Sequence, residues 1–161
     1  MLYACGTGQF PYFEGPTSQY AFPALTVSGS LDFNGTTHGV TGGGWYDRQW
    51  SRSRGAFGMA NPFIWFGLCL DGGENLSIWN AGGRTWTTVG HPDGTHTLTA
   101  MTLEGRPGHW VIAVPFLDAT LDVAHRRLHG DHGFYTGLCK VEGTWRGAPA
   151  AGYGFVDRVA R

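Results

Sequence analysis

Residues 41–50 hold more hydrogen-bonding and ionisable groups than any other stretch of this sequence. Three glycines are followed by two tryptophans, a tyrosine, an acid, a base and an amide within six positions. In a strand, alternate side chains point to opposite faces. One face would then carry Trp45, Asp47 and Gln49, and the other Tyr46, Arg48 and Trp50. Each face mixes an aromatic ring with a polar group, unlike an ordinary half-buried strand, and such exceptions concentrate at functional sites.

The polar groups of this stretch suit two kinds of chemistry. Gln49, Tyr46 and Arg48 are hydrogen-bond donors that could polarise a carbonyl oxygen, and such donors act most strongly in a dry cavity. Asp47 is a candidate acid. The alternative is structural: a buried network of Asp47 with Arg48 or Gln49 would set the sheet register, because buried polar groups need partners.

Asp157 is the second candidate acid. It alternates with Tyr153 and Phe155, so the three side chains share one face of a predicted strand. If that face is interior, desolvation raises the pKa of Asp157, and the carboxyl could act as a general acid or base near neutral pH. The alternative is a salt bridge with Arg48, Arg146 or Arg158.

Aromatic side chains would supply the walls of a binding site for an apolar substrate. Each of these aromatic side chains could instead be an ordinary member of the hydrophobic core. The residues that we select for this role are Trp45, Tyr46, Trp50, Trp65, Phe66, Trp79, Trp110, Tyr135 and Tyr153.

The sequence predicts neither a metal nor a cofactor. His125 and His129 are four residues apart, which is roughly 13 Å on a strand and too far for one ion. A solvated turn is the simpler interpretation of that segment. Phosphate-binding, nucleophile-elbow and dinucleotide-binding glycine motifs are all missing.

Composition excludes several classes of function. A length of 161 residues favours one domain, and a net charge of −1 with scattered arginines argues against nucleic-acid binding. The longest apolar run, residues 63–70, is too short to cross a bilayer. The first residues show no signal-peptide pattern, and three separated cysteines suggest free buried thiols, so we expect a cytoplasmic location.

Short apolar segments separated by turn signals predict an all-β protein with about ten strands and little or no helix. We expect residues 1–20 to form an aromatic arm or loop, and residues 21–161 to form one antiparallel barrel or sandwich. Asn34-Gly35 predicts a hairpin turn, and residues 51–60 a polar loop. The strands are expected near residues 20–28, 30–33, 38–50, 63–70, 75–80, 84–89, 95–103, 109–115, 117–128, 134–142 and 152–159.

Residues 45–50 resemble the W-x-D-H/R-Q-W-G signature of the lipocalin-like proteins grouped with hydroxyneurosporene synthase (carotenoid 1,2-hydratase) and the AttH proteins. Residues 20–31, 63–73 and 134–157 are similar to that family's lead-in strand, its W-x-W-F strand with an L-D-D-G turn, and its closing strand pair. The resemblance implies an antiparallel lipocalin-like β-barrel.

Three departures from the family pattern bear on function. The family's two-barrel members have a further N-terminal segment. The resemblance therefore implies either a shortened single barrel, or a homo-oligomer or second chain that supplies the missing half. Arg48 stands where histidine is commoner, and arginine cannot relay protons. Asn80 stands where hydratase-type members would be expected to carry an acid.

The family also includes natural-product cyclases, whose chemistry requires shape more than acid strength. The resemblance therefore implies a cofactor-independent cyclase or isomerase, of Diels-Alder or related type, acting on a hydrophobic polyketide or terpenoid-like intermediate. Positioning alone can lower a barrier by about 7 to 11 kcal/mol in ideal cases. The alternatives are a hydratase that adds water to an alkene of a carotenoid-like lipid, and a non-catalytic lipocalin-type binder of an apolar ligand.

Overall fold

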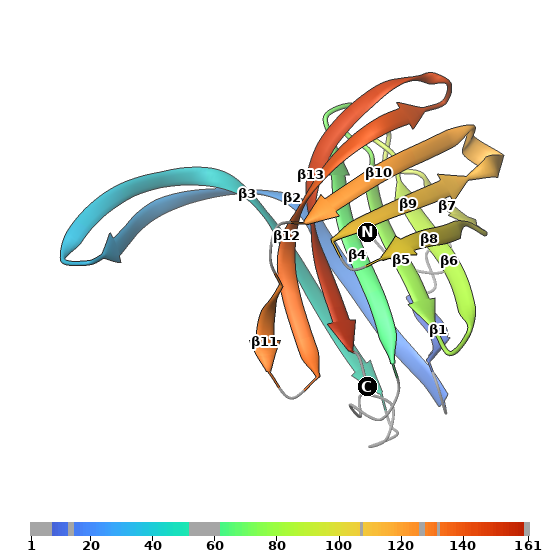
Figure 1. The fold of residues 1–161 in the computed structure, drawn as a ribbon, viewed down its shortest axis with the longest axis horizontal. Helices are drawn as coiled ribbons and strands as arrows, with labels where there is room; N and C mark the ends of the chain where they lie inside the picture. The colour runs from blue at the N-terminus through green and yellow to red at the C-terminus, as the bar shows by residue number, and fades with distance from the viewer. Residues whose placement is uncertain are drawn as a thin grey trace.

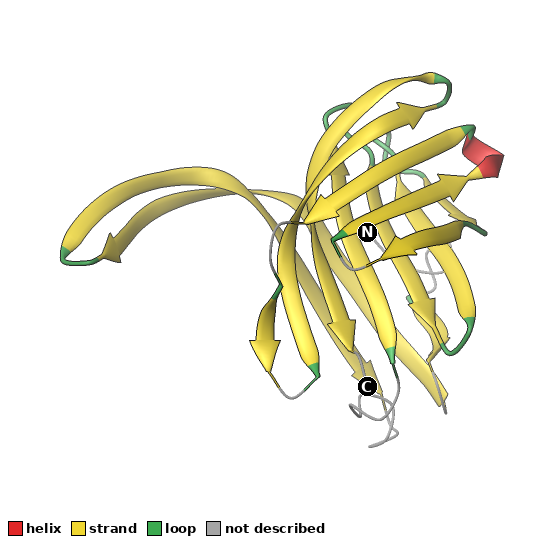
Figure 2. Cartoon of the chain, viewed as in Figure 1, coloured by secondary structure: helices red, strands yellow, loops and turns green. Residues whose placement is uncertain are grey.

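The computed structural model describes residues 8–12, 15–51, 62–106, 108–125, 128–131 and 133–159. These residues form two antiparallel sheets, with one short 3₁₀ turn at Pro115–Leu117 and no α-helix within the described ranges (Figures 1 and 2). The expected loop at residues 51–60 falls almost entirely outside the described residues.

The smaller sheet has the order β1-β2-β3, with β1 at Gln9–Tyr12, β2 at Gly15–Phe33 and β3 at Thr36–Ser51. The predicted turn is confirmed: Asn34 and Gly35 both have positive φ angles, 49° and 76°, as a tight two-residue hairpin requires. Residues 9–12 and 15–20 are paired strands and not the loop that we expected, because backbone pairing does not need the side-chain period that we looked for. Residues 20–33 form one strand, not two.

The larger sheet curls into a barrel with the order β7-β6-β5-β4-β13-β12-β10-β9-β8, and β11 pairs with β12. All its pairs are antiparallel, which confirms the predicted fold class. The strands are β4 (Phe63–Leu70), β5 (Asn75–Ala81), β6 (Arg84–Gly90), β7 (His96–Thr99), β8 (Thr102–Arg106), β9 (His109–Val114), β10 (Ala119–His125), β11 (His129–Asp131), β12 (Phe134–Trp145) and β13 (Ala148–Val159).

Residues 95–103, expected as one strand, form two, and the break has a structural role. β7 and β8 are the two end strands of the sheet order, so residues 100 and 101 carry the chain from one end to the other. Met101 is 3% exposed in the core, and its carbonyl oxygen accepts a hydrogen bond from Thr85 Oγ1 at 2.8 Å. The connection through residues 100 and 101 therefore helps to bring the two edges of the curled sheet together.

The barrel interior holds a cluster of buried side chains. The alternation predicted for residues 117–123 is confirmed on β10: Leu121 and Val123 are fully buried, whereas Thr120 and Asp122 are exposed. The cluster comprises Ile64, Phe66, Leu68, Leu70, Leu76, Ile78, Val89, Met101, Ile112, Val114, Ala119, Leu121, Val123, Cys139, Val141, Trp145 and Val156. Cys69 and Cys139 are free and buried, as expected, and burial raises the pKa of the Cys139 thiol to about 12.

A second apolar cluster lies outside the barrel, between its wall and the smaller sheet. It consists of Ala21, Trp65, Trp79 and Ala81, with Trp45, Phe63, Trp86 and Phe155 packed against it. The base of the β2–β3 hairpin therefore covers one side of the barrel. Because β4 sends Trp65 to this layer and Phe66 to the interior, both its faces are buried, as its unbroken apolar sequence predicts.

Beyond this base the hairpin projects away from the barrel (Figure 1). A β-bulge between Phe22 and Leu25 marks the change, with Ala24 at φ 52°. Bulges bend and twist a strand. Within the described ranges, no helix is long and apolar enough to cross a membrane.

Candidate functional site

The two faces of residues 45–50 have different surroundings. Trp45, Asp47 and Gln49 are partly buried and face the barrel. Tyr46, Arg48 and Trp50 face away from it, and Tyr46 and Trp50 are about half exposed. The structure thus divides four of the five candidate catalytic residues: Asp47 and Gln49 lie between the sheets, whereas Tyr46 and Arg48 lie on the outer side of the hairpin.

Asp47 is held by donors from two directions. Its Oδ2 accepts a hydrogen bond from Gln19 Nε2 at 3.0 Å, and its Oδ1 accepts one from Trp45 Nε1 at 2.8 Å. Gln19 is 2% exposed. This network resembles the structural alternative that the sequence suggested, except that its members are Gln19 and Trp45 in place of Arg48 and Gln49.

The tryptophans between the sheets form a continuous row. The Trp45 and Trp65 rings meet edge to face at 5.8 Å, and Trp79 is stacked on Trp86 at 6.0 Å. Trp65 Nε1 donates a buried hydrogen bond to Ser77 Oγ at 2.9 Å. Gly67 makes room for the row, because a Cβ atom there would lie 2.7 Å from the Trp65 ring and 3.0 Å from Trp45. The row is therefore tightly packed beneath β3.

Gln49 brings an unused hydrogen-bond donor into this layer. It is the cross-strand partner of Gln19. Among the described residues, Gln49 Nε2 and Gln19 Oε1 are buried polar atoms with no hydrogen-bond partner. Such an atom costs about 1–3 kcal/mol. A ligand carrying a carbonyl group would supply the acceptor that Gln49 lacks.

Asp157 lies on the same outer face of the barrel wall. Its cross-strand neighbours are Trp65 on β4 and Thr136 on β12. Desolvation raises the pKa of Asp157, and a hydrogen bond from Thr136 opposes that rise only in part. Asp157 therefore binds its proton more tightly than an exposed carboxyl does.

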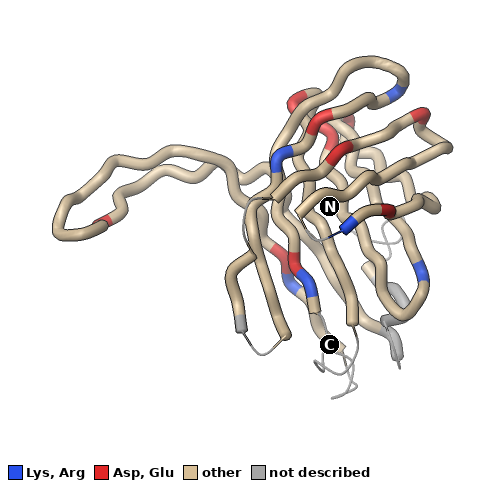
Figure 3. Tube along the Cα trace, in the orientation of Figure 1, with Lys and Arg blue, Asp and Glu red and all other residues tan. Residues whose placement is uncertain are grey.

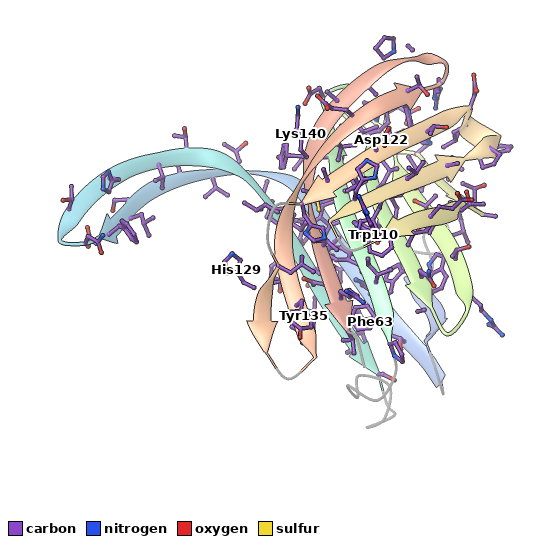
Figure 4. All side chains as sticks on the ribbon, in the orientation of Figure 1. Phe63, Trp110, Asp122, His129, Tyr135 and Lys140 are labelled. Carbon is purple, nitrogen blue, oxygen red and sulfur yellow. The ribbon has the colours of Figure 1, made fainter. Side chains whose placement is uncertain are left out.

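A cavity of about 470 Å³ lies on the outer face of β10, β12 and β13, beside β11. Its size is that of a site for a small organic molecule. Figure 4 labels two of its polar members, His129 and Lys140. The lining residues are Ala124, His129, Thr136, Gly137, Leu138, Cys139, Lys140 and Phe155.

Two residues join this cavity to the groups described above. Thr136 lines the cavity and hydrogen-bonds Asp157, and Phe155 lines it while packing against the cluster of Trp65 and Trp79. We take the cavity, Asp157 and the adjoining aromatic row as the candidate site. A concave apolar surface beside a carboxyl with a raised pKa is the usual signature of a functional site.

The remaining aromatic candidates are dispersed. Phe66 is fully buried in the barrel core and packs on Trp110 at 6.1 Å. Trp110 also lines a cavity of about 280 Å³ with Phe63 and Arg158. Tyr135 is the cross-strand neighbour of Arg158, and Figure 4 places Tyr135 and Phe63 toward the same end of the barrel. Tyr153 hydrogen-bonds Cys69, and burial raises the pKa of its hydroxyl.

The sequence did not reveal Thr136, His129 or Leu138 as members of a site. Thr136 is a single hydroxyl in a strand, and its role follows only from its register opposite Asp157. His129 belongs to the histidine segment that we interpreted as a solvated turn. Register between distant strands leaves no local mark in sequence, so no pattern could have selected these residues.

The fold is that of the lipocalin-like β-barrels. It matches kievitone hydratase from Nectria haematococca, with 19% identity, a TM-score of 0.82, and coverage of 96% of this chain and 56% of that one. It also matches an AttH-like protein from Nitrosomonas europaea, with 19% identity, a TM-score of 0.81, and coverage of 99% and 57%. Likeness at this identity shows the shared fold.

The chain spans just over half the length of each of these two proteins. No family model matches the sequence, and no curated protein matches it. The AttH-like neighbour agrees with the resemblance seen in residues 45–50 at the level of fold.

Proposed function

We propose that this protein is a hydratase that adds water to a carbon–carbon double bond of an apolar substrate. The observation that carries the proposal is the position of Asp157, a desolvated carboxyl with a raised pKa, one hydrogen bond from an apolar cavity. Burial raises the pKa of Asp157, so the carboxyl holds its proton to a higher pH than an exposed one, which favours a role as general acid in alkene protonation. One of the two proteins of the same fold is a hydratase by name.

The chemistry assigns a role to each described group. The apolar side chains of Leu138 and Phe155 hold the substrate, and Thr136 stands between the cavity and the Asp157 carboxyl. Asp157, through the Thr136 hydroxyl, supplies a proton to one alkene carbon. The oxygen of a water molecule bonds to the other carbon. His129, which is exposed at the cavity, accepts the proton that this water loses and releases it to solvent. Asp157 takes up a proton from solvent, which returns both groups to their starting state.

Labelled water tests this proposal directly. The protein would be incubated with kievitone, with neurosporene and with related prenylated alkenes in ¹⁸O-water or in deuterium oxide. A hydratase gives a product with one ¹⁸O in a new hydroxyl and one deuterium on the neighbouring carbon. Consumption of substrate without either label contradicts hydration.

Gln49 favours a second candidate, the cyclase or isomerase. Its unpartnered buried Nε2 lies in the same layer as Trp45 and Trp65 and is suited to polarise a carbonyl group on a folded polyene. A pericyclic reaction gives an isomer of the substrate that contains no label from water. Recovery of a bound ligand unchanged would instead support a carrier.

A further inference from the structure

One face of the β2–β3 hairpin carries large hydrophobic side chains along its length, with His38 and Arg48 among them, and no other described part of the chain covers them. Of thirteen exposed large hydrophobic side chains among the described residues, eight belong to this hairpin, with exposed fractions from 38% to 62%. They are Phe22, Leu25, Val27, Leu31 and Phe33 on β2, and Val40, Tyr46 and Trp50 on β3. We call this surface the hairpin face.

Strand register places these side chains on one side. Phe22 is opposite Tyr46 and Leu25 is opposite Gly44, so the extra residue of the bulge keeps Phe22 and Leu25 on the same face. A Cβ atom on Gly44 would lie 3.0 Å from Val27, which confirms the continuity. At the base, the Phe22 and Tyr46 rings are 6.2 Å apart. The face thus has an aromatic base, an aliphatic middle and Phe33 beside the turn.

The opposite side of the same hairpin is buried at its base and polar at its tip. At the base, Gln19 and Ala21 are buried against the barrel. At the tip, β2 alternates Thr26, Ser28 and Ser30 with the apolar residues, so the far side is polar. Alternation of this kind belongs to a strand with one buried face. The exposed large hydrophobic side chains of the hairpin all lie on the apolar face.

The size of the hairpin face is that of a protein interface. At roughly 100 Å² for each half-exposed side chain, eight of them present on the order of 800 Å². A stable complex of standard size buries about 800 Å² on each partner. A patch this large on a monomer normally marks an interaction site.

We propose that the hairpin face is closed by the hairpin face of a second copy of this chain. The chain itself supplies an apolar surface of the same length and shape, and two-fold pairing makes such a surface self-complementary. The projecting part of the hairpin has Asp32 as its one formal charge, and the register of Asp32 opposite Thr37 places it on the polar side. Figure 3 shows the acidic colour near the end of the projecting hairpin. A two-fold axis across the strands places the tip of each hairpin on the aromatic base of the other. This arrangement also keeps the two Arg48 side chains apart.

The test uses two neighbouring positions on β2 that face opposite ways. Leu31→Asp puts a carboxylate into the hairpin face, and Ser30→Asp puts the same group on the polar side. Mass would be measured by light scattering after gel filtration over a dilution series. The unaltered protein and Ser30→Asp should have twice the 17.4 kDa of one chain. Leu31→Asp should weaken the dimer at least tenfold.

Circular dichroism and thermal melting would verify that the barrel is intact, and Val27→Asp with Ser28→Asp provides a second matched pair. The proposal is overturned if the unaltered protein has the mass of one chain at every concentration. It is equally overturned if both aspartates of a pair leave the dimer unchanged. A monomer that closes this face only against a different polypeptide would assign the surface to that other partner.

Discussion

The two sides of β4 contact two aromatic-containing regions that differ in character. Phe66 points into the barrel, where it is surrounded by aliphatic side chains of the main core. Trp65 lies on the opposite side of the strand and points outward into the row of tryptophans. The polar side chains of Ser77, Asp47 and Gln49 lie in the same layer. The interior region stabilises the fold by burial alone. The outer region combines rings with polar groups, and it adjoins the cavity beside Asp157.

The largest expected effect comes from the interior. Phe66→Ala removes a fully buried ring, and truncations of this kind cost about 3–5 kcal/mol because a cavity remains. Equilibrium urea unfolding would measure the loss. A cost below about 1 kcal/mol would show that the interior is loosely packed, and the contrast with the outer region would fail.

Asp157→Asn tests the outer region by activity. Removal of a general acid should lower the rate of water addition by about 100-fold or more. Thr136→Val, which keeps the shape and removes the hydroxyl that passes the proton from Asp157 to the cavity, should lower the rate by a similar factor. Full activity in Asp157→Asn would exclude this carboxyl from the chemistry.

The same substitution has a pH signature in stability. The pKa of Asp157 in the folded protein is raised above its ordinary value of 3.8. Between those two pKa values the folded state binds more protons than the unfolded state, so stability falls as pH rises through that window. Asp157→Asn should remove this fall and be the more stable protein at neutral pH. Thermal melts of the unaltered protein and of Asp157→Asn at several pH values would show whether their stabilities diverge as the pH rises.

Gly67→Ala tests how tightly the outer row is packed. The added methyl group would meet the Trp65 and Trp45 rings at 2.7 and 3.0 Å, and overpacking of this kind costs about 1–3 kcal/mol. Gly39→Ala is the control on the polar side of the projecting hairpin, because Gly39 lies opposite Ser30 and a Cβ atom there meets nothing within 4 Å. Equal unfolding free energies for the two variants would argue against a close contact between the sheets.

The smallest expected effect concerns the hydrogen bond of Trp65. Trp65→Phe keeps a ring in the row but leaves the buried Ser77 hydroxyl without its donor, at a cost of about 1 kcal/mol. Adding Ser77→Ala should recover most of that loss, because neither polar group then remains. If the double variant is no more stable than the single one, the ring shape and not the hydrogen bond accounts for the cost.

Local patterns in the sequence were sufficient for much of the fold. The Asn34-Gly35 turn, the apolar run of β4 and the alternation of β10 all appear where they were predicted, because each depends on residues close in the chain. The division of residues 45–50 into two faces also follows from the strand period alone. For residues 1–20 we predicted an arm or a loop, and the paired strands at residues 9–12 and 15–20 contradict the loop, because their pairing leaves no side-chain pattern in the sequence.

Tertiary structure decided which of these faces meets which partner. Nothing local shows that Trp45 packs on the outside of the barrel, that Asp157 lies opposite Thr136, or that the bulge after Phe22 keeps the large hydrophobic side chains of the hairpin on one face. These features depend on register and layering between residues far apart in the chain. The sequence by itself therefore determined the strands and their two sides, and the packing of the sheets determined which side became core, which became candidate site and which remained open.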